Sequence, residues 1–426
     1  MAQDHAQAAA WYRKAAEQGY AAAQSNLGVA YANGQGVTQD HVQAAVWLRK
    51  AAEQGLAQAQ HNLGFAYANG VGVTQDHAQA TAWYRKAADQ GYAGAQFNLG
   101  EAYHEGIGVP KDYAQAAAWY RKAAEQGHAK AQYALSFAYG KGEGLTQDYA
   151  LAAAWCRKAA AQGLATAESK LGMAYYNGDG VPQNHVQAAV WWRKAADQGY
   201  AEAQYNLGFA YHKGDGVPQD HRQAAAWYRK AADQGYAYAQ LNLGFAYTNG
   251  DGVPQDHRQA AAWYRKAADQ GLAEAQYNLG RSYHDSQGVA RDDGQAIAWL
   301  RKAAEQGNAN AQISLGVAYA NGEGAAQDHA QAAAWWRKAA DQGDAMAQYN
   351  LGVAYAKGEG VPPDHAQAAA WFRKAAEQGY AEAQVNLGVA YENGEGVPKD
   401  RGEADRWFRK AGRRFLDSSS PRDVTK

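Results

Sequence analysis

Histidine is the residue type that first suggests chemistry in this sequence, because it recurs at one position of a regular pattern. Eight copies directly follow an Asp or Asn: His5, His41, His77, His185, His221, His257, His329 and His365. Zinc ligands converge at about 2 Å from the metal, whereas stacked helices lie about 8–10 Å apart. No His-Glu-x-x-His or Cys-x-x-Cys motif accompanies them. We therefore expect solvated histidines in the first turns of helices, and no metal site.

Paired Arg-Lys residues are the second chemical signal, and they run from Arg13-Lys14 to Arg409-Lys410. Alone, they would suggest a basic stripe for nucleic acid. However, the chain has 41 basic and 42 acidic residues, and an acid usually follows each Arg by four positions, as in Arg49 and Glu53. This spacing predicts salt bridges along one exposed helix face. We expect no nucleic-acid partner.

Cys156 is the only cysteine, so an intramolecular disulfide is excluded. It occupies a position that Tyr12, Tyr84, Tyr120 and Tyr228 fill elsewhere. The pattern places no base beside it, so a packing cysteine is favoured over a nucleophile. Because the sequence shows no set of residues spaced for catalysis, we expect no enzyme activity and no cofactor.

These residues are positioned by a strict internal repeat. Tryptophans recur every 36 residues: Trp11, Trp47, Trp83, Trp119, Trp155, Trp191, Trp227, Trp263, Trp299, Trp335, Trp371 and Trp407. Such a period indicates stacked supersecondary units. We divide the chain into a half repeat at 1–19, holding helix B alone, eleven repeats of 36 residues at 20–415, and a polar tail at 416–426.

Each repeat predicts helix A, a turn, helix B and a second turn. Asp40 with Gln43 three residues later has the spacing of a helix N-cap. Gly19 and its equivalents fit the left-handed position that follows a helix. Gly28 and its equivalents lie within helix A, where glycine costs about 1 kcal/mol relative to alanine. We expect helix B to cross helix A there at backbone contact.

The recurring pattern A-x-A-Q-x-N-L-G-x-A-Y-x-x-G-x-G-V-P-Q-D, followed by Q-A-A-x-W-Y-R-K-A-A-x-Q-G, resembles the Sel-one-like repeat. This family is related to the tetratricopeptide repeat. The resemblance implies an all-α fold, a right-handed α/α superhelix whose A helices line a concave groove. It also implies a scaffold for protein complexes or host interactions. Some cysteine-rich members are credited with acting on β-lactams, but their paired cysteines and a Ser-x-x-Lys motif are absent here.

The candidate binding residues are those at which the repeats differ, at the equivalents of positions 22, 25, 29, 32 and 33. Their spacing places them on one face of helix A. In the middle of the chain this face is aromatic: Phe97, Tyr133, Phe137, Tyr176, Tyr205, Phe209, Tyr238, Phe245 and Tyr277. Charged residues lie among them: Glu101, Lys130, Lys141, Glu202, Lys213, Glu274 and Arg281. Aromatic side chains are typical of binding hot spots, although partly buried apolar positions would vary in the same way.

An asparagine ladder is the second candidate feature of the groove. Asn206, Asn242 and Asn278 are among eight asparagines that precede the recurring leucine. An amide offers both a donor and an acceptor to a peptide backbone. The alternative is that these residues fix contacts of helix A. Ala134, Lys170 and Ser314 interrupt the ladder.

The two ends of the array differ. Residues 1–19 keep the interior pattern with no helix A before them, so we expect an exposed apolar face there, and hence fraying or end-to-end self-association. Asp405, Arg406, Arg413 and Arg414 make the last helix polar, as a terminal cap requires. No run of eighteen apolar residues predicts a membrane span. As written the chain predicts a cytoplasmic adaptor that binds a protein or peptide; an export signal upstream would instead make it a periplasmic or secreted factor.

Overall fold

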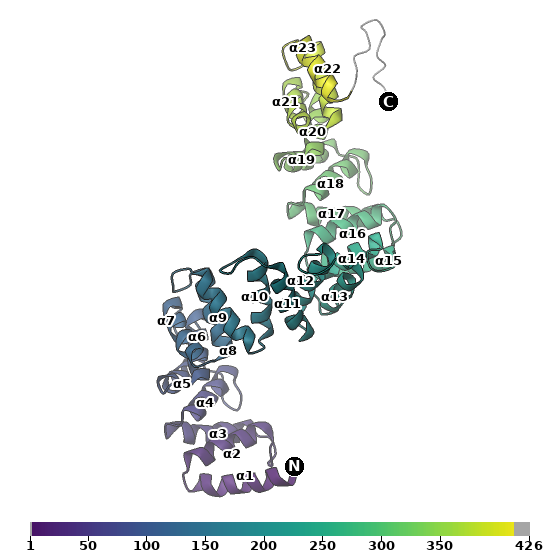
Figure 1. The fold of residues 1–426 in the computed structure, drawn as a ribbon. Coiled ribbons are helices and arrows are strands. Elements are labelled where there is room, and N and C mark those ends of the chain that lie inside the picture. Colours follow the sequence, from purple (N-terminus) through teal and green to yellow (C-terminus); the bar gives the residue numbers. More distant parts are fainter. Residues whose placement is uncertain (1, 413–426) are drawn as a thin grey trace. The chain divides into compact units, whose positions relative to one another are not determined.

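The computed structural model describes residues 2–412, which form 23 α-helices and no strands (Figure 1). The chain divides into two units, Met1–Gln219 and Asp220–Lys426. The first unit contains α1 (Ala2–Glu17), α2 (Ala21–Asn33), α3 (His41–Glu53), α4 (Ala57–Asn69), α5 (His77–Asp89), α6 (Ala93–Glu105), α7 (Tyr113–Glu125), α8 (Ala129–Lys141), α9 (Tyr149–Ala161), α10 (Ala165–Asn177), α11 (His185–Asp197) and α12 (Ala201–Lys213).

The second unit continues the same alternation of helix B and helix A. It contains α13 (His221–Asp233), α14 (Ala237–Asn249), α15 (His257–Asp269), α16 (Ala273–His284), α17 (Asp293–Glu305), α18 (Ala309–Asn321), α19 (His329–Asp341), α20 (Ala345–Lys357), α21 (His365–Glu377), α22 (Ala381–Asn393) and α23 (Arg401–Lys410). The tail at 416–426, Arg413 and Arg414 lie outside the described residues. The all-α solenoid predicted from the sequence is confirmed.

The helix boundaries follow the capping signals. The Asp40 side chain accepts a hydrogen bond from the Gln43 backbone N–H, which satisfies one free donor at the start of α3. Helix α2 ends at Gly34, whose φ of 67° is left-handed. Glycine is required at position 36 for a steric reason, because a Cβ there would lie 2.0 Å from the His5 carbonyl oxygen of the preceding helix B. The turn therefore packs directly on the neighbouring helix.

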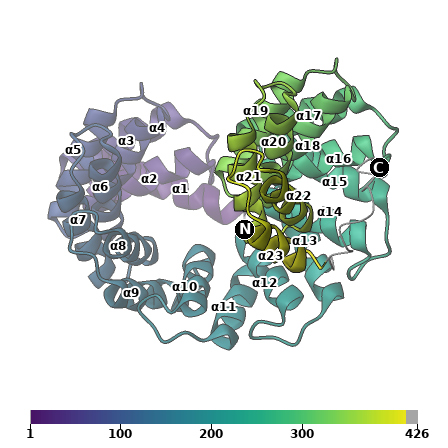
Figure 2. The same ribbon diagram turned by 90° about the horizontal axis from the view of Figure 1, so that it is seen from above.

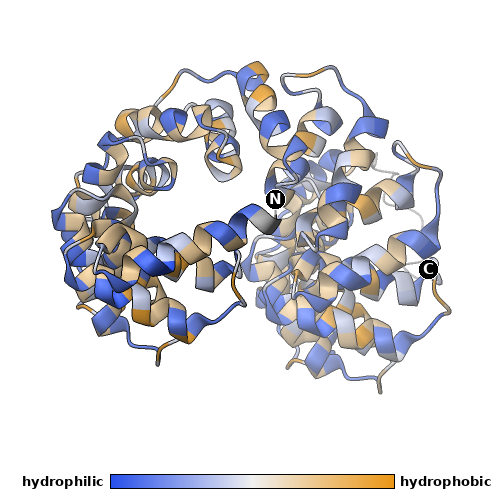
Figure 3. Ribbon diagram, turned by 90° about the horizontal axis from the view of Figure 1, so that it is seen from below, coloured by the Kyte–Doolittle hydropathy of each residue, from blue (hydrophilic) through white to orange (hydrophobic). Residues whose placement is uncertain are grey.

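Within a repeat, helix A and helix B meet at the glycine inside helix A, as predicted. A Cβ added to Gly64 would lie 2.7 Å from Cδ1 of Tyr84 and 3.1 Å from the Ala80 carbonyl oxygen. The leucine that precedes this glycine, Leu63, is completely buried. Hydrophilic and hydrophobic residues alternate along the helices, as expected for helices with one buried face (Figure 3).

The tryptophans connect successive repeats. Trp119 on α7 packs against Leu99 of α6 in its own repeat and against Tyr84 of α5 in the preceding repeat. Trp11 has no described helix pair before it and leaves 68% of its surface exposed. In all twelve copies, the lysine of the Arg-Lys pair covers the indole, with Nζ 3.7–4.8 Å from a ring centroid. Six of the twelve tryptophans are buried, five are half-buried and Trp11 is exposed. The predicted core role therefore holds for the six buried rings, each with one face covered by a cation.

The arginines of the Arg-Lys pairs make other contacts than the predicted salt bridges. Arg49 does not form an ion pair with Glu53; it donates a hydrogen bond to the Tyr67 hydroxyl of the following helix A. The eleven arginines of the Arg-Lys pairs from Arg13 to Arg373 all make the equivalent bond. Because each bond joins helix B to the next helix A, the arginines stabilise the stack between repeats.

A buried glutamine provides a further link between repeats. Gln24 donates from Nε2 to the Ala16 carbonyl oxygen at 3.1 Å, and its Oε1 accepts from Gln54 Nε2 at 2.7 Å. Ten repeats carry glutamine at this position, and one carries Glu168. The amide thus joins the C-terminal ends of two successive B helices.

Candidate functional site

The A helices of the first unit lie on the inner side of its curve. In Figure 2, α6, α8 and α10 lie inside, while α7, α9 and α11 form the outer layer. Two adjoining pockets open there, and both are lined by Tyr133 and Phe137 of α8. We name them by their content: the acidic pocket contains Glu101, Glu105 and Glu143, and the Cys156 pocket contains the single cysteine.

The acidic pocket has a volume of about 390 Å³. Glu101 accepts a hydrogen bond from the Tyr120 hydroxyl. His104 lies between two carboxylates, with Nδ1 2.8 Å from Glu105 and Nε2 3.1 Å from Glu143. Burial lowers the pKa of His104, but the hydrogen bonds and charges of the two glutamates outweigh burial and raise it above its usual value.

Aromatic rings form the remaining wall of the acidic pocket. The Phe97 ring lies 6.0 Å from the Tyr120 ring and 5.0 Å from that of His128. Phe137 is 40% exposed, so its ring is available to a ligand. Lys130 is the one lysine in the lining, against three carboxylates. Aromatic faces beside carboxylates favour a cationic group with an apolar stem.

Metal binding does not explain these acids. Across residues 2–412, no group of three or more His, Cys, Asp or Glu side chains is arranged to hold a metal ion. The recurring histidines also face solvent to different degrees, and His41, His77 and His365 are exposed.

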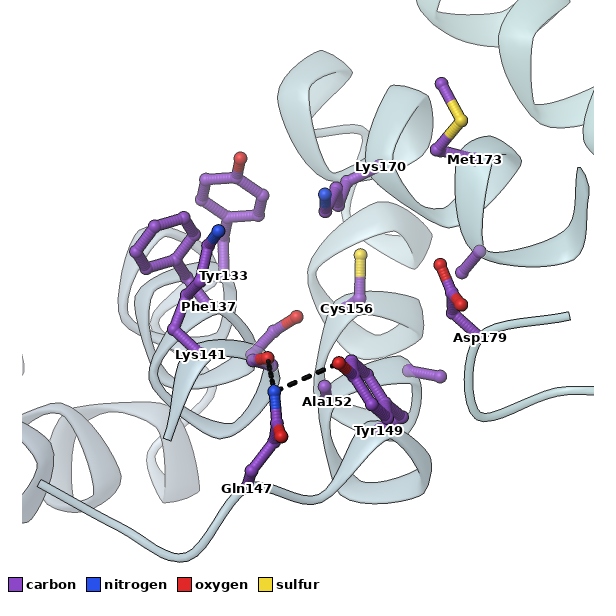
Figure 4. A pocket seen from close by; sticks show the side chains of 14 residues that line it. Tyr133, Phe137, Lys141, Gln147, Tyr149, Ala152, Cys156, Lys170, Met173 and Asp179 are labelled. Carbon is purple, nitrogen blue, oxygen red and sulfur yellow. Dashed lines mark hydrogen bonds between the residues drawn. The ribbon is translucent and has the colours of Figure 1, made fainter. Parts of the chain in front are cut away.

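The Cys156 pocket, shown in Figure 4, has a volume of about 240 Å³. Cys156 is 2% exposed and its Sγ donates to the Ala167 carbonyl oxygen at 3.2 Å. Burial raises the pKa of this thiol to about 11, which keeps it protonated and weakly nucleophilic at neutral pH. The predicted packing role agrees with this environment.

The other predicted aromatic residues are not gathered into one site. Tyr176 stacks on His185 with ring centroids 4.7 Å apart, and its hydroxyl donates to Asp215 at 3.2 Å. Phe209 lies below Lys213, whose Nζ is 5.9 Å from the ring centroid. These residues and Tyr205 belong to the first unit. Of the predicted set, only Phe97, Tyr133 and Phe137 line the two pockets described above.

The remaining predicted aromatic residues belong to the second unit. Tyr238 is 53% exposed. Phe245 meets the Tyr264 ring edge-on at 5.6 Å, and Tyr277 packs against the apolar cluster around Leu300. Tyr238 is therefore the most accessible of the three.

The asparagine ladder has mixed environments. Asn98 Nδ2 lies 3.0 Å from His61 Nε2, and Asn278 Nδ2 donates to the Glu274 carbonyl oxygen at 2.8 Å. Asn206 is 8% exposed, and its Nδ2 finds no hydrogen-bond partner among the described residues. Each asparagine therefore has its own local role, and gripping of a peptide backbone stays a hypothesis.

Several pocket residues were not among the predicted site residues. His104, Glu105 and Glu143 come together from two repeats, 39 positions apart for the His104–Glu143 pair. Ser136 and Cys156 were also not among them, although Ser136 replaces a glycine found in the ten other repeats, and Cys156 replaces a side chain that is large in every other copy. Comparing the repeats at these two positions together points to the Cys156 pocket.

The geometry and the repeat define an α/α repeat protein of the scaffold class. The Sel1 repeat model matches residues 1–20, 21–56, 57–92, 93–128, 129–164, 165–200, 201–236, 237–272, 273–308, 309–344, 345–380 and 381–414. The chain belongs to the Sel1 repeat family, whose members are generally protein-interaction scaffolds.

Two solved structures illustrate the relationship. A protective antigen present in uropathogenic Escherichia coli strains, which displays an SLR fold, shares 44% identity with a TM-score of 0.85, covering 95% of this chain and 86% of that one. A Sel1 repeat protein from Oxalobacter formigenes shares 37% identity with a TM-score of 0.56, covering 71% of this chain and 87% of that one. No curated protein matches the chain significantly. Within residues 2–412, no helix is long and apolar enough to cross a membrane.

Proposed function

We propose that this protein is a non-enzymatic scaffold that binds a protein segment along the inner face of its first unit. The supporting observation is that the variable positions of α6, α8 and α10 line two adjoining pockets with aromatic walls. The scaffold around them is constant, from the capping aspartates to the buried leucines. Variation confined to one face is typical of a recognition surface.

The spacing of the helices sets the form of the bound segment. Neighbouring A helices lie about 10 Å apart, and an extended chain advances about 3.3 Å per residue. A segment that crosses α6, α8 and α10 would therefore present a side chain to each helix about every three residues. Glu101, Glu105 and Glu143 favour a Lys or Arg side chain at the acidic pocket.

The test compares an inner-face variant with a matched outer-face variant. Partners are isolated by pull-down from native lysate, and the bound segment is identified by mass spectrometry and measured by calorimetry. Phe97→Ala with Phe137→Ala should weaken binding about thirtyfold, since truncating an aromatic anchor costs about 2 kcal/mol. Leu151→Ala with Val186→Ala is the control, because Leu151 on α9 is 42% exposed, close to the 40% of Phe137.

Loss of the partner in the outer-face variant alone would place the function on the B helices. The asparagine hypothesis is tested separately with Asn206→Ala and Asn242→Ala, each measured alone. If affinity and stability both stay at the wild-type value, the asparagines do not grip the backbone, and the aromatic contribution is unaffected by that result.

A second candidate is an envelope or host-directed factor on the same scaffold. The likeness to a protective antigen, at 44% identity over most of both chains, favours it. Antibody labelling of intact and lysed native cells separates the two candidates. Labelling of intact cells supports the exported factor, whereas labelling after lysis alone supports the intracellular scaffold.

A further inference from the structure

The Cys156 pocket contains a paired exchange at the crossing of α8 and α9. In the two adjoining repeats the glycine of helix A faces a ring on helix B, as with Gly100 and Tyr120 or Gly172 and Trp192. A Cβ on Gly172 would lie 2.5 Å from Cδ1 of Trp192, so a side chain and the ring exclude each other. The repeat 129–164 changes both partners, to Ser136 and Cys156.

This exchange places a small side chain where the other repeats have a large one. The slot of Cys156 holds a large side chain in every other copy: Tyr12, Leu48, Tyr84, Tyr120, Trp192, Tyr228, Tyr264, Leu300, Trp336, Phe372 and Phe408. The pocket that Cys156 lines has a volume of about 240 Å³, which exceeds the roughly 150 Å³ of an apolar cavity that holds benzene. The pocket thus has room for one aromatic side chain.

The walls of the pocket suit an aromatic ring. In Figure 4, Tyr133 and Phe137 stand on one side, Lys170 and Met173 on the other, and Cys156 lies between them. A thioether makes favourable contacts with aromatic edges, and an ammonium group such as that of Lys170 attracts a ring face. The Cys156 thiol already donates a hydrogen bond to the Ala167 carbonyl oxygen, so an apolar ligand would leave no donor of this thiol without a partner.

We propose that the Cys156 pocket is a subsite for one Phe, Tyr or Trp side chain of the bound segment. This inference rests on the proposed binding of a protein segment to the inner face. The chain's own exposed rings do not serve: Phe137 is 40% and Tyr149 is 51% exposed at the mouth, and the Tyr149 hydroxyl accepts from Gln147 at 3.0 Å.

The first experiment uses N-acetyl-phenylalaninamide as the probe and the methionine methyl groups as reporters. Met173 lines this pocket and Met346 lines a separate pocket of the second unit. In the full chain labelled with 13C-methyl methionine, we expect a saturable shift of the Met173 signal at millimolar probe and no saturable shift of Met346. N-acetyl-leucinamide should bind at least several-fold more weakly. Equal binding of the two probes, or no saturable Met173 shift, would overturn the proposal.

Two variants fill the pocket without disturbing the fold. Ser136→Gly with Cys156→Tyr restores the pair found in the adjoining repeats. Gly140→Tyr fills it from the opposite wall, since a Cβ there would approach nothing closer than Ala152 Cβ at 3.8 Å, and Tyr176 occupies the equivalent position. Both should keep the helical content and thermal transition of the wild type and weaken the probe at least tenfold. Undiminished binding in both variants would contradict the proposed location.

A peptide-display selection separates this inference from the proposed function. Selection on the wild type should enrich peptides with an aromatic residue at one fixed position, and selection on the filled variants should lose that preference alone. Peptides without any aromatic preference on wild type would refute the subsite while leaving segment binding intact. Failure to enrich any peptide, with the probe still bound at Met173, would instead refute segment binding.

Discussion

At the scale of single residues, the repeat provides its own comparison, because each position is filled twelve or nearly twelve times in one chain. Glu168 is the one acid in the row of buried glutamines. It accepts from Gln198 Nε2 at 2.7 Å, as glutamine would. As a carboxylate it cannot donate to the Ala160 carbonyl oxygen, the bond that the ten glutamines make to their equivalents.

Glu168→Gln should therefore stabilise the protein by about 1 kcal/mol at pH 7, the typical net value of a buried hydrogen bond. Burial raises the pKa of Glu168, so its favourable contribution is complete below the unfolded-state value and is lost as pH rises through the folded-state value. The gain from Glu168→Gln should thus grow between about pH 4 and pH 7. Urea unfolding across this range measures it, and an equal or larger gain at pH 4 would contradict the argument.

His104 gives a second residue-scale prediction. Its raised pKa depends on Glu105 and Glu143, so Glu143→Gln should lower the pKa of His104 toward about 6.5. NMR titration of the imidazole measures this, with Glu125→Gln on α7 as an exposed control that should change nothing. Since the folded pKa is raised, the stability that His104 contributes is present below about pH 6.5 and is lost as pH rises through the folded value. An unchanged pKa in Glu143→Gln would show that the glutamate does not act on the ring.

At the scale of elements, the sequence predicted well what depends on neighbours along the chain. The Asp40 cap and the glycine at the helix crossing follow from local spacing and from the cost of glycine in a helix. The partner of Arg49 did not follow, because four-residue spacing reveals only neighbours on one helix, whereas Tyr67 lies 18 residues away on another. The Cys156 pocket was missed for the same reason, since its lining residues come from three helices, α8, α9 and α10.

The tryptophans carry the element-scale prediction. Trp119→Ala should cost roughly 3–5 kcal/mol, because the ring is 8% exposed and packs on Leu99 of its own repeat and Tyr84 of the preceding repeat. Trp11→Ala is the matched control at the same repeat position; with 68% of its surface exposed, it should cost less than about 0.5 kcal/mol. Chemical unfolding measured by circular dichroism compares them at a concentration at which the chain is monomeric. Equal losses of stability in the two variants would show that burial does not determine how much each tryptophan stabilises the fold.

At the scale of the whole molecule, each repeat contacts its neighbours in sequence, so stability is a sum of local terms. When one interface between repeats is lost, segments of the chain should then unfold separately before the whole fold is lost. Hydrogen exchange of Trp119→Ala should show faster opening of α5–α8, with α17–α22 of the second unit protected as in the wild type. Uniformly faster exchange along the chain would indicate one cooperative unit instead.

The last prediction concerns self-association of this chain. Helix α1 has the pattern of an interior helix B, yet Trp11 is 68% and Tyr12 is 37% exposed. The opposite end is polar, with Arg406 paired to Glu403 at 3.1 Å, so a head-to-tail contact would bury charge against an apolar face. We therefore expect α1 to pair with α1 of a second copy, in a symmetric dimer that closes on itself.

Sedimentation equilibrium tests this pairing. The wild type should dimerise as concentration rises, and Trp11→Ser with Tyr12→Ser should remain monomeric. Val42→Ser with Val46→Ser on α3 is the control, because these side chains are also apolar and exposed, at 60% and 43%, but belong to a helix that already packs on both neighbours. It should dimerise like the wild type. A wild type that stays monomeric at high concentration would refute the pairing, and longer oligomers would favour the head-to-tail contact over the symmetric one.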